Sequence, residues 1–252
     1  MTKQFAIYPS LQDKTVFITG GASGIGAEIV NAFVAQGSRV GFVDIDQAAG
    51  EAMLAAIGTP HQFVCCDLRD INALQHAFAQ LAETLGPAQV LVNNAAHDDR
   101  HDWRTVTPAY WDERMATNLR HLFFAIQAVA PGMMAAGDGA IINLGSNSWW
   151  ETGAGFPAYA TAKSAVHGLT RTMARELGGH GIRVNTVVPG WIMTERQKTH
   201  WVTDEAIEKQ RQRQCLPELI EPVYVARMVV FLAADDARMC TANNFMVEAG
   251  SI

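Results

Sequence analysis

The sequence predicts an α/β fold, a doubly wound, seven-stranded parallel sheet with helices on both faces. Three observations lead to this prediction. Short β-rich runs alternate with longer helical patterns from Lys14 onward, most of the runs are apolar throughout, and a glycine-rich turn follows the first of them. Strands that are apolar on both faces are typical of a parallel sheet covered by helices on both sides.

The seven expected strands are the short apolar runs, in chain order TVFIT (15–19), RVGFVD (39–44), QFVCC (62–66), QVLVNN (89–94), AIINLGS (140–146), RVNTVVP (183–189) and NFMVEA (244–249). Helical patterns between them span 24–36, 46–57, 70–85, 107–134, 158–177 and 221–234. One irregular piece, 191–220, follows the sixth strand. Insertions of this length in α/β domains are usually lids or substrate loops, so we expect that role here.

Length and composition indicate one domain, residues 1–252, that both binds a dinucleotide and carries catalysis. The chain has 252 residues, 49% of them hydrophobic, and shows no repeat or linker. Its 19 basic and 25 acidic residues give a net charge of −6, which argues against a nucleic-acid or membrane partner and favours a small-molecule substrate. The N-terminal stretch has no long apolar core, so we expect a cytoplasmic protein.

Cysteines and histidines offer little support for a metal site. The four cysteines, Cys65, Cys66, Cys215 and Cys240, lack CxxC spacing, so we expect reduced thiols. His97 and His101 are four residues apart with carboxylates between them, a spacing that brings two ligands together only on a helix. They follow a strand end directly, so we predict a loop at the crevice and no metal.

A glycine-rich turn, TGGASGIG (19–26), joins the first strand to the first helix. Glycine allows a sharp turn and close backbone approach, and a helix N-terminus offers free N–H groups and a favourable dipole to an anion. A strand before this motif and a helix after it are the context in which it binds a dinucleotide pyrophosphate.

Two aspartates end the second and third strands. Asp44 is placed to accept hydrogen bonds from a ribose 2′-hydroxyl and to repel a 2′-phosphate, and no basic residue stands at Ala22 or Ile45. We therefore favour NAD over NADP. Asp67 is placed to bind adenine. The alternative for each aspartate is a cap on the helix that follows it.

Tyr159 and Lys163 lie one helical turn apart and so share a helix face. A tyrosine pKa of about 10 is too high for a base at neutral pH, but a nearby ammonium and an oxidised nicotinamide would each favour the phenolate. Tyr159 is therefore a candidate general base for an alcohol. An ordinary surface pair is the alternative for two residues at this spacing.

Together these motifs resemble the short-chain dehydrogenase/reductase family from Lys14 to Gly250. They are, in chain order, the turn 19–26, Asn93-Asn94-Ala95-Ala96, Asn118, Ser146, Tyr159-Ala160-Thr161-Ala162-Lys163 and Pro189-Gly190. The resemblance implies a Rossmann fold, an NAD(P)-dependent oxidoreductase and a homotetramer assembled through 107–134, 158–177 and the C-terminal segment. Ala96 departs from the family's usual glycine, and 247–250 depart from its usual Asp-Gly-Gly ending.

The resemblance also implies residue roles. Tyr159 would take the substrate proton, Ser146 would hydrogen-bond the same oxygen, and Asn118 would anchor a proton-passing water. Lys163 would hold the nicotinamide ribose and lower the pKa of the tyrosine. The implied cofactor contacts are Gly20, Ser23, Gly24, Ile25, Gly26, Asp44, Asp67, Leu68, Asn94, Tyr159, Lys163, Pro189, Gly190, Ile192 and Thr194.

Residues after the fourth, fifth and sixth strands should face one substrate crevice. The predicted substrate contacts are His97, Asp98, Ser146, Asn147, Ser148, Trp150, Tyr159, Trp191, Arg196 and Trp201. Hydrogen-bonding groups beside flat aromatic faces favour a sugar over a steroid or fatty-acyl group. The alternative for some of the tryptophans is packing beneath the loop.

Stretches outside the general motifs resemble the aldose 1-dehydrogenases of this family. They are Ala6-Ile7-Tyr8-Pro9-Ser10-Leu11, Asp98-Asp99-Arg100-His101, Tyr110-Trp111-Asp112-Glu113-Arg114, Asn118-Leu119-Arg120-His121, Arg196-Gln197 and Gln214-Cys215-Leu216. This resemblance implies oxidation of an aldose, such as D-xylose, L-arabinose, D-galactose or L-fucose, at its anomeric C1 hydroxyl to give an aldonolactone.

Three other readings remain open. The enzyme could act on another secondary alcohol, such as a polyol, a 3-hydroxyacyl thioester or a steroid. A non-catalytic NAD-binding sensor could dispense with Ser146, Tyr159 or Lys163, yet all three are present. A metal-dependent hydrolase built on His97 and His101 would need a further ligand, and the sequence offers no matching cluster.

Overall fold

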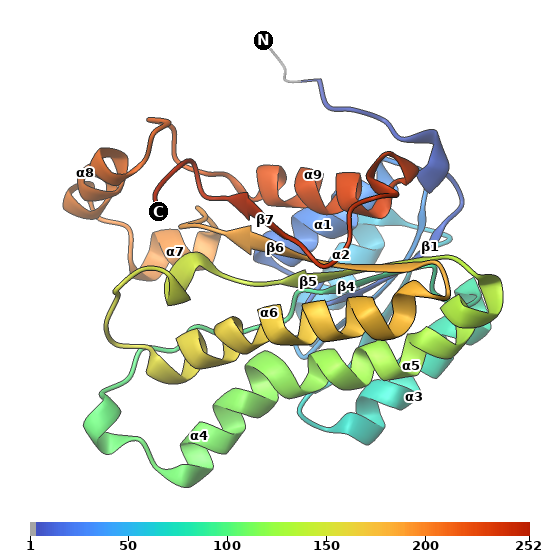
Figure 1. Ribbon diagram of the computed structural model, residues 1–252, viewed down its shortest axis with the longest axis horizontal. Helices are drawn as coiled ribbons and strands as arrows, with labels where there is room; N and C mark the ends of the chain where they lie inside the picture. Colours follow the sequence, from blue (N-terminus) through green and yellow to red (C-terminus); the bar gives the residue numbers. More distant parts are fainter. Residues whose placement is uncertain (1–3) are drawn as a thin grey trace.

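A seven-stranded parallel sheet organises the structure, a computed structural model that describes residues 4–252 (Figure 1). Residues 1–3 of the expected domain lie outside the described residues. The strands are β1 (Thr15–Thr19), β2 (Arg39–Asp44), β3 (Gln62–Cys65), β4 (Val90–Asn93), β5 (Gly139–Leu144), β6 (Ile182–Pro189) and β7 (Asn244–Val247). They are ordered β3-β2-β1-β4-β5-β6-β7, which confirms the predicted fold class.

Helices cover both faces of the sheet, as the apolar strands require. The helices are α1 (Gly24–Val34), α2 (Gln47–Ile57), α3 (Ile71–Leu85), α4 (Pro108–Met115), α5 (His121–Ala136), α6 (Pro157–Gly178), α7 (Glu195–His200), α8 (Asp204–Arg213) and α9 (Pro222–Ala233). One hydrophobic core joins the sheet to α1 and α9, with α2 at its margin, and a second joins the opposite face to α3, α5 and α6 (Figure 1).

The helix expected over 107–134 is interrupted by a π-helical turn, Ala116–Arg120, between α4 and α5. In this turn the side-chain amide of Asn118 donates to the Arg114 carbonyl at 3.0 Å. A side chain that bonds into the backbone ladder is one cause of irregularity in a helix. Residue periodicity alone predicted an unbroken helix because the bulge inserts a single residue.

The segment 191–220, expected as one irregular piece, contains the two short helices α7 and α8. Each begins at a threonine whose side chain accepts a hydrogen bond from the backbone N–H three residues on, Thr194 from Gln197 and Thr203 from Ala206. No residue of α7 is buried, so apolar packing contributes little to its position.

The order in which successive strands are added to the sheet reverses between β1 and β4: β2 and β3 lie on one side of β1, and β4 to β7 lie on the other. Register pairs Thr19 with Asn93 at their carboxyl ends, while Asp44 pairs with Cys65 and Asn143 with Thr186 on the two sides. A crevice forms at such a switch point because the loops on its two sides leave in opposite directions. Within residues 4–252, no helix is long and apolar enough to span a membrane.

Candidate active site

A cleft of about 950 Å³ lies along the carboxyl ends of the strands. Every residue that the sequence placed at the cofactor lines this cleft, namely Gly20, Ser23, Gly24, Ile25, Gly26, Asp44, Asp67, Leu68, Asn94, Tyr159, Lys163, Pro189, Gly190, Ile192 and Thr194. The sheet therefore brings together, at the carboxyl ends of its strands, residues that the chain spreads over six segments.

The glycine turn shapes the first part of the cleft. Gly20 and Gly24 have φ of +66° and +55°, in the left-handed region that favours glycine. A Cβ on Gly26 would lie 1.8 Å from the Gly20 carbonyl oxygen, so that position accepts no side chain. Ser23, exposed at the start of α1, makes no capping hydrogen bond, which leaves its hydroxyl and the first N–H groups of α1 available to an anion.

Asp44 stands beside the glycine turn and does not cap a helix. Its carboxylate accepts hydrogen bonds from the backbone N–H groups of Ala22 at 3.0 Å and Asp46 at 3.1 Å. The cap of α2 is Asp46, which accepts from the N–H of Ala49. The capping alternative for Asp44 is therefore wrong, and its carboxylate faces the cleft at the end of β2.

Asp67 is likewise not a cap, since Asp70 caps α3. The Asp67 carboxylate is paired with Arg69, whose Nη2 lies 2.7 Å from Oδ2, and these hydrogen bonds lower the pKa of Asp67. Arg69 also reaches Glu113 on α4 at 3.1 Å. A glycine cradle, an uncapped helix and two aspartates at strand ends together fit a dinucleotide.

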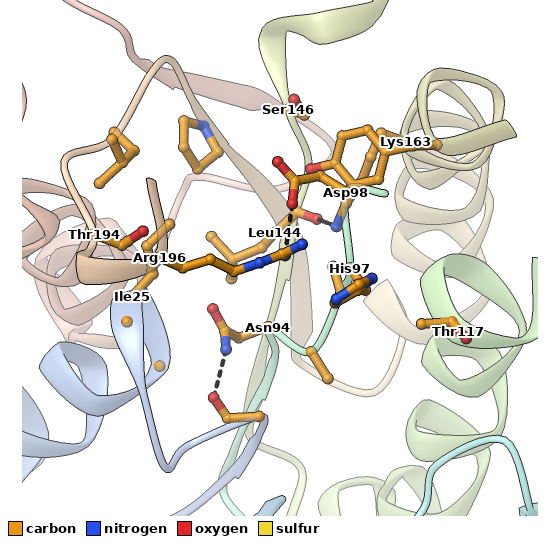
Figure 2. A pocket seen from close by; sticks show the side chains of 18 of the residues that line it. Ile25, Asn94, His97, Asp98, Thr117, Leu144, Ser146, Lys163, Thr194 and Arg196 are labelled. Atoms are coloured by element: carbon orange, nitrogen blue, oxygen red, sulfur yellow. Dashed lines mark hydrogen bonds and ion pairs between the residues drawn. The ribbon is translucent and has the colours of Figure 1, made fainter. Parts of the chain in front are cut away.

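The Tyr159 and Lys163 pair lies at the other part of the cleft, on α6. Lys163 is only 2% exposed, and its ammonium donates to the Leu144 carbonyl at 2.7 Å. Its Nζ is 5.8 Å from the centre of the Tyr159 ring. Ser146 and Lys163 lie at the same end of the cleft (Figure 2). The pair is therefore not an ordinary surface pair.

The pKa of Tyr159 is raised to about 12 in this structure. Burial is the main cause because it removes the water that would solvate the phenolate, and the negative charge of Asp98 adds to it. The Ser146 hydroxyl and the guanidinium groups of Arg100 and Arg196 act in the opposite direction.

Lys163 is not among the groups that lower the pKa of Tyr159 in this structure, and its expected effect on the phenol stays a prediction. Burial lowers the pKa of Lys163 itself to about 8, and its ammonium is directed to the Leu144 carbonyl. The sequence correctly placed the cation one helical turn from the phenol. It could not indicate the loss of hydration on burial, which disfavours the charged form of both groups.

Asn118, the fourth expected catalytic residue, does not line the cleft and is fully buried in the π-helical turn. Its side-chain oxygen accepts from the backbone N–H of His97 at 2.7 Å, while its amide donates to the Arg114 carbonyl. It thereby joins the loop after β4 to the long helix. Its expected role in holding a water stays a prediction.

Most of the expected substrate contacts line the cleft, namely His97, Asp98, Ser146, Asn147, Ser148, Tyr159, Trp191 and Arg196. Trp150 and Trp201 do not. The ring of Trp150 stacks on Trp149 at 3.5 Å between centroids, and Trp201 lies under the guanidinium of Arg100. Both residues are 38% exposed, so these two tryptophans neither line the cleft nor pack beneath the loop, as the alternative expected.

The two histidines that follow β4 both contact Asp99, His97 its carboxylate and His101 its carbonyl oxygen. The Nδ1 of His97 lies 3.1 Å from Asp99, whereas His101 bonds the Tyr110 hydroxyl at 3.0 Å through its Nδ1 and receives the N–H of Ala158 at its Nε2. Throughout the described part of the chain, no three His, Cys, Asp or Glu residues are grouped to hold a metal ion. The segment is a loop fastened to its neighbours.

Sequence reasoning missed part of the cleft wall. Glu113, Arg114 and Thr117 line it from α4 and the π turn, and Gln197 lines it from α7. Arg114 is buried and bonds both Asp99 and His97. The available signal was the aldose dehydrogenase resemblance, because three of its stretches, 98–101, 110–114 and 196–197, converge here.

Comparisons with known proteins agree with this geometry. A family model described as enoyl-(acyl carrier protein) reductase matches residues 20–251. The chain is 48% identical to a D-xylose 1-dehydrogenase of Caulobacter vibrioides, covering 97% of this chain and 98% of that protein. It is 42% identical to a probable galactose dehydrogenase of Rhizobium meliloti, covering 99% of each.

A solved structure shares the fold over the whole chain. It is the crystal structure of a 3-oxoacyl-[acyl-carrier protein] reductase from Brucella melitensis, with a TM-score of 0.90 and 29% identity, and the similarity covers 100% of this chain and 98% of that one.

Proposed function

Because this chain belongs to the short-chain dehydrogenase/reductase family, we propose that it is an NAD(P)-dependent aldose 1-dehydrogenase. It oxidises the anomeric C1 hydroxyl of a pentose or a related sugar and yields the aldonolactone. The observation that carries this function is that Ser146, Tyr159 and Lys163 line one cleft, in a chain 48% identical to a D-xylose 1-dehydrogenase.

The chemistry follows from the positions of these side chains. Tyr159 accepts the proton of the C1 hydroxyl, and Ser146 hydrogen-bonds the same oxygen and orients it. Lys163 lies one turn further along α6, with its ammonium 5.8 Å from the centre of the Tyr159 ring, where it would hold the ribose of a bound cofactor. A bound oxidised nicotinamide would supply the hydride acceptor and a positive charge that favours ionisation of the Tyr159 phenol, whose pKa is raised to about 12 here.

We propose NAD as the preferred cofactor. The Asp44 carboxylate is held at the end of β2 by two backbone N–H groups, where it would accept hydrogen bonds from a ribose hydroxyl and repel a 2′-phosphate. The neighbouring positions Ala22 and Ile45 carry no positive charge that could attract that phosphate.

We further propose that residues 1–252 act as one dinucleotide-binding and catalytic domain, with 191–220 as its substrate loop. A homotetramer, as the family resemblance implies, would use the long helices, where Trp111 and Phe123 are exposed. Sedimentation velocity on the purified protein tests the assembly, and a monomer at working concentration would contradict it.

A substrate panel tests the function. Initial rates of NAD reduction are measured with D-xylose, L-arabinose, D-galactose and L-fucose, and with a polyol, a 3-hydroxyacyl thioester and a steroid alcohol. We expect turnover with at least one aldose and trapping of its lactone by hydroxylamine. Turnover confined to the polyol, thioester or steroid would contradict an aldose substrate and favour another secondary alcohol. NAD binding without any turnover would favour a non-catalytic NAD-binding sensor.

A further inference from the structure

A polar contact joins α7, on one side of the cleft, to the loop after β4 on the other side. Arg196 and Gln197, both on α7, reach the same carboxylate, that of Asp98 in the loop after β4. The Arg196 Nη1 lies 2.7 Å from Oδ1, and the Gln197 amide lies 3.0 Å from Oδ2. Figure 2 shows the Arg196 side chain extending across the cleft toward Asp98.

The two sides of this contact differ in how firmly they are held. The loop after β4 is anchored to α4, since Asp99 of the loop pairs with the buried Arg114 of α4 at 2.9 Å. In contrast, α7 spans only Glu195–His200 and has no buried residue. The bonds to Asp98 are therefore a main source of its position, together with the Trp191 indole, which donates to Gln197 at 2.9 Å.

The same contact governs the charge around the Tyr159 phenol. Asp98, from the loop after β4, opposes ionisation of the phenol, whereas Arg196 from α7 and Arg100 from the same loop as Asp98 favour it. The remaining facing groups are the Ser146 hydroxyl and, on α6, Lys163, whose ammonium is bonded to the Leu144 carbonyl. A displaced α7 would leave Asp98 facing Tyr159 without its partner.

We propose that Asp98, Arg196 and Gln197 form a latch that holds α7 over the substrate and brings the Arg196 guanidinium to offset Asp98 beside Tyr159. Arg196 is thus a positioning residue that couples closure of the cleft to the readiness of the tyrosine to accept a proton. This inference rests on the proposed function, because it requires Tyr159 to act as the base.

The pH dependence of kcat/KM for the sugar, at saturating NAD, tests the latch. In Arg196→Gln the unpaired Asp98 makes the phenolate less favourable, so the acid limb should move to higher pH by about one unit. In Asp98→Asn the opposing charge is gone, so the limb should move to lower pH. The double variant should return toward the wild-type profile because both charges are absent.

Two further variants separate charge from shape. Arg196→Lys keeps the positive charge and should keep the profile within a few tenths of a unit of wild type. Lys198→Gln removes a positive charge from the same helix, where Lys198 pairs with Glu195 on the exposed side, and should leave the profile unchanged. An equal shift in Lys198→Gln would show a general effect of charge and overturn the latch.

Tyr159→Phe separates this inference from the proposed function. If that variant keeps its turnover, Tyr159 is not the base and both proposals are wrong. If turnover is lost, while Arg196→Gln and Asp98→Asn shift the profile in the same direction or leave it in place, only the latch is wrong. Opposite shifts from these two variants would support it, since a merely structural role predicts losses without opposite shifts.

Discussion

The two halves of the cleft are built in different ways. On the cofactor side, the shape comes from backbone, with Gly20, Gly24 and Gly26 in conformations or contacts that exclude a side chain. On the substrate side, the shape comes from side chains on separate segments that bond one another, such as Asp98 in the loop after β4 and Arg196 on α7. A backbone site depends on residues close in sequence, whereas a side-chain site depends on the fold to bring distant residues together.

The largest effect is expected where the two halves meet. Tyr159→Phe removes the proton acceptor and should lower turnover by about 10²–10⁴-fold. NAD affinity, measured by fluorescence titration, should stay within about threefold because the ring and the glycine turn remain. Tyr8→Phe, on a tyrosine that packs near Phe231 at 6.4 Å between centroids, is the matched control and should keep full activity.

A change in the glycine turn should break the cofactor half alone. Gly26→Ala would place a Cβ against the Gly20 carbonyl, and overpacking of this kind costs about 1–3 kcal/mol. We expect NAD affinity to fall by about 10- to 100-fold. Gly168→Ala, at a position in α6 with open space around it, should leave affinity unchanged and stabilise the protein by about 0.5–1 kcal/mol. Equal NAD affinities in Gly26→Ala and Gly168→Ala would contradict the claim that the backbone of the glycine turn shapes the cofactor half of the cleft.

Cofactor choice sharpens the comparison within the cofactor half. Asp44→Ser removes a charged hydrogen-bond acceptor, worth about 1.5–3 kcal/mol, and the repulsion of a 2′-phosphate. The ratio of kcat/KM for NAD to that for NADP should fall by about tenfold or more. Asp70→Ser removes an equal charge at the cap of α3 while keeping a capping oxygen, and should not change the ratio.

The smallest effect is expected at a residue outside the cleft. Trp201→Ala removes an exposed ring that lies 5.2 Å from the Arg100 guanidinium, a contact worth about 0.5–1 kcal/mol. The KM for the sugar should change by less than about fivefold. A change above tenfold, measured from initial rates, would indicate that α7 carries Trp201 into the substrate site on closure.

Sequence reasoning reached the cofactor half almost completely but only part of the substrate half. Asp44 and Asp67 line the cleft as expected, because the end of a parallel strand can be located from the sequence pattern of that strand alone. Trp150 and Trp201 were placed in the cleft and lie outside it, and Arg114 was not placed there although it lines it. A long side chain can extend to either side of the segment that carries it, and the groups it contacts in the fold decide which side it takes.

The sequence by itself determined the α/β class, the seven strands, the glycine turn and the Tyr159 and Lys163 pair, because each depends on local periodicity or short spacing. Only the tertiary structure decided that the buried Lys163 ammonium bonds the Leu144 carbonyl, and that Arg196 and Gln197 of α7 bond Asp98. The first depends on the burial of Lys163, and the second depends on charges brought together from positions 98 residues apart in the chain.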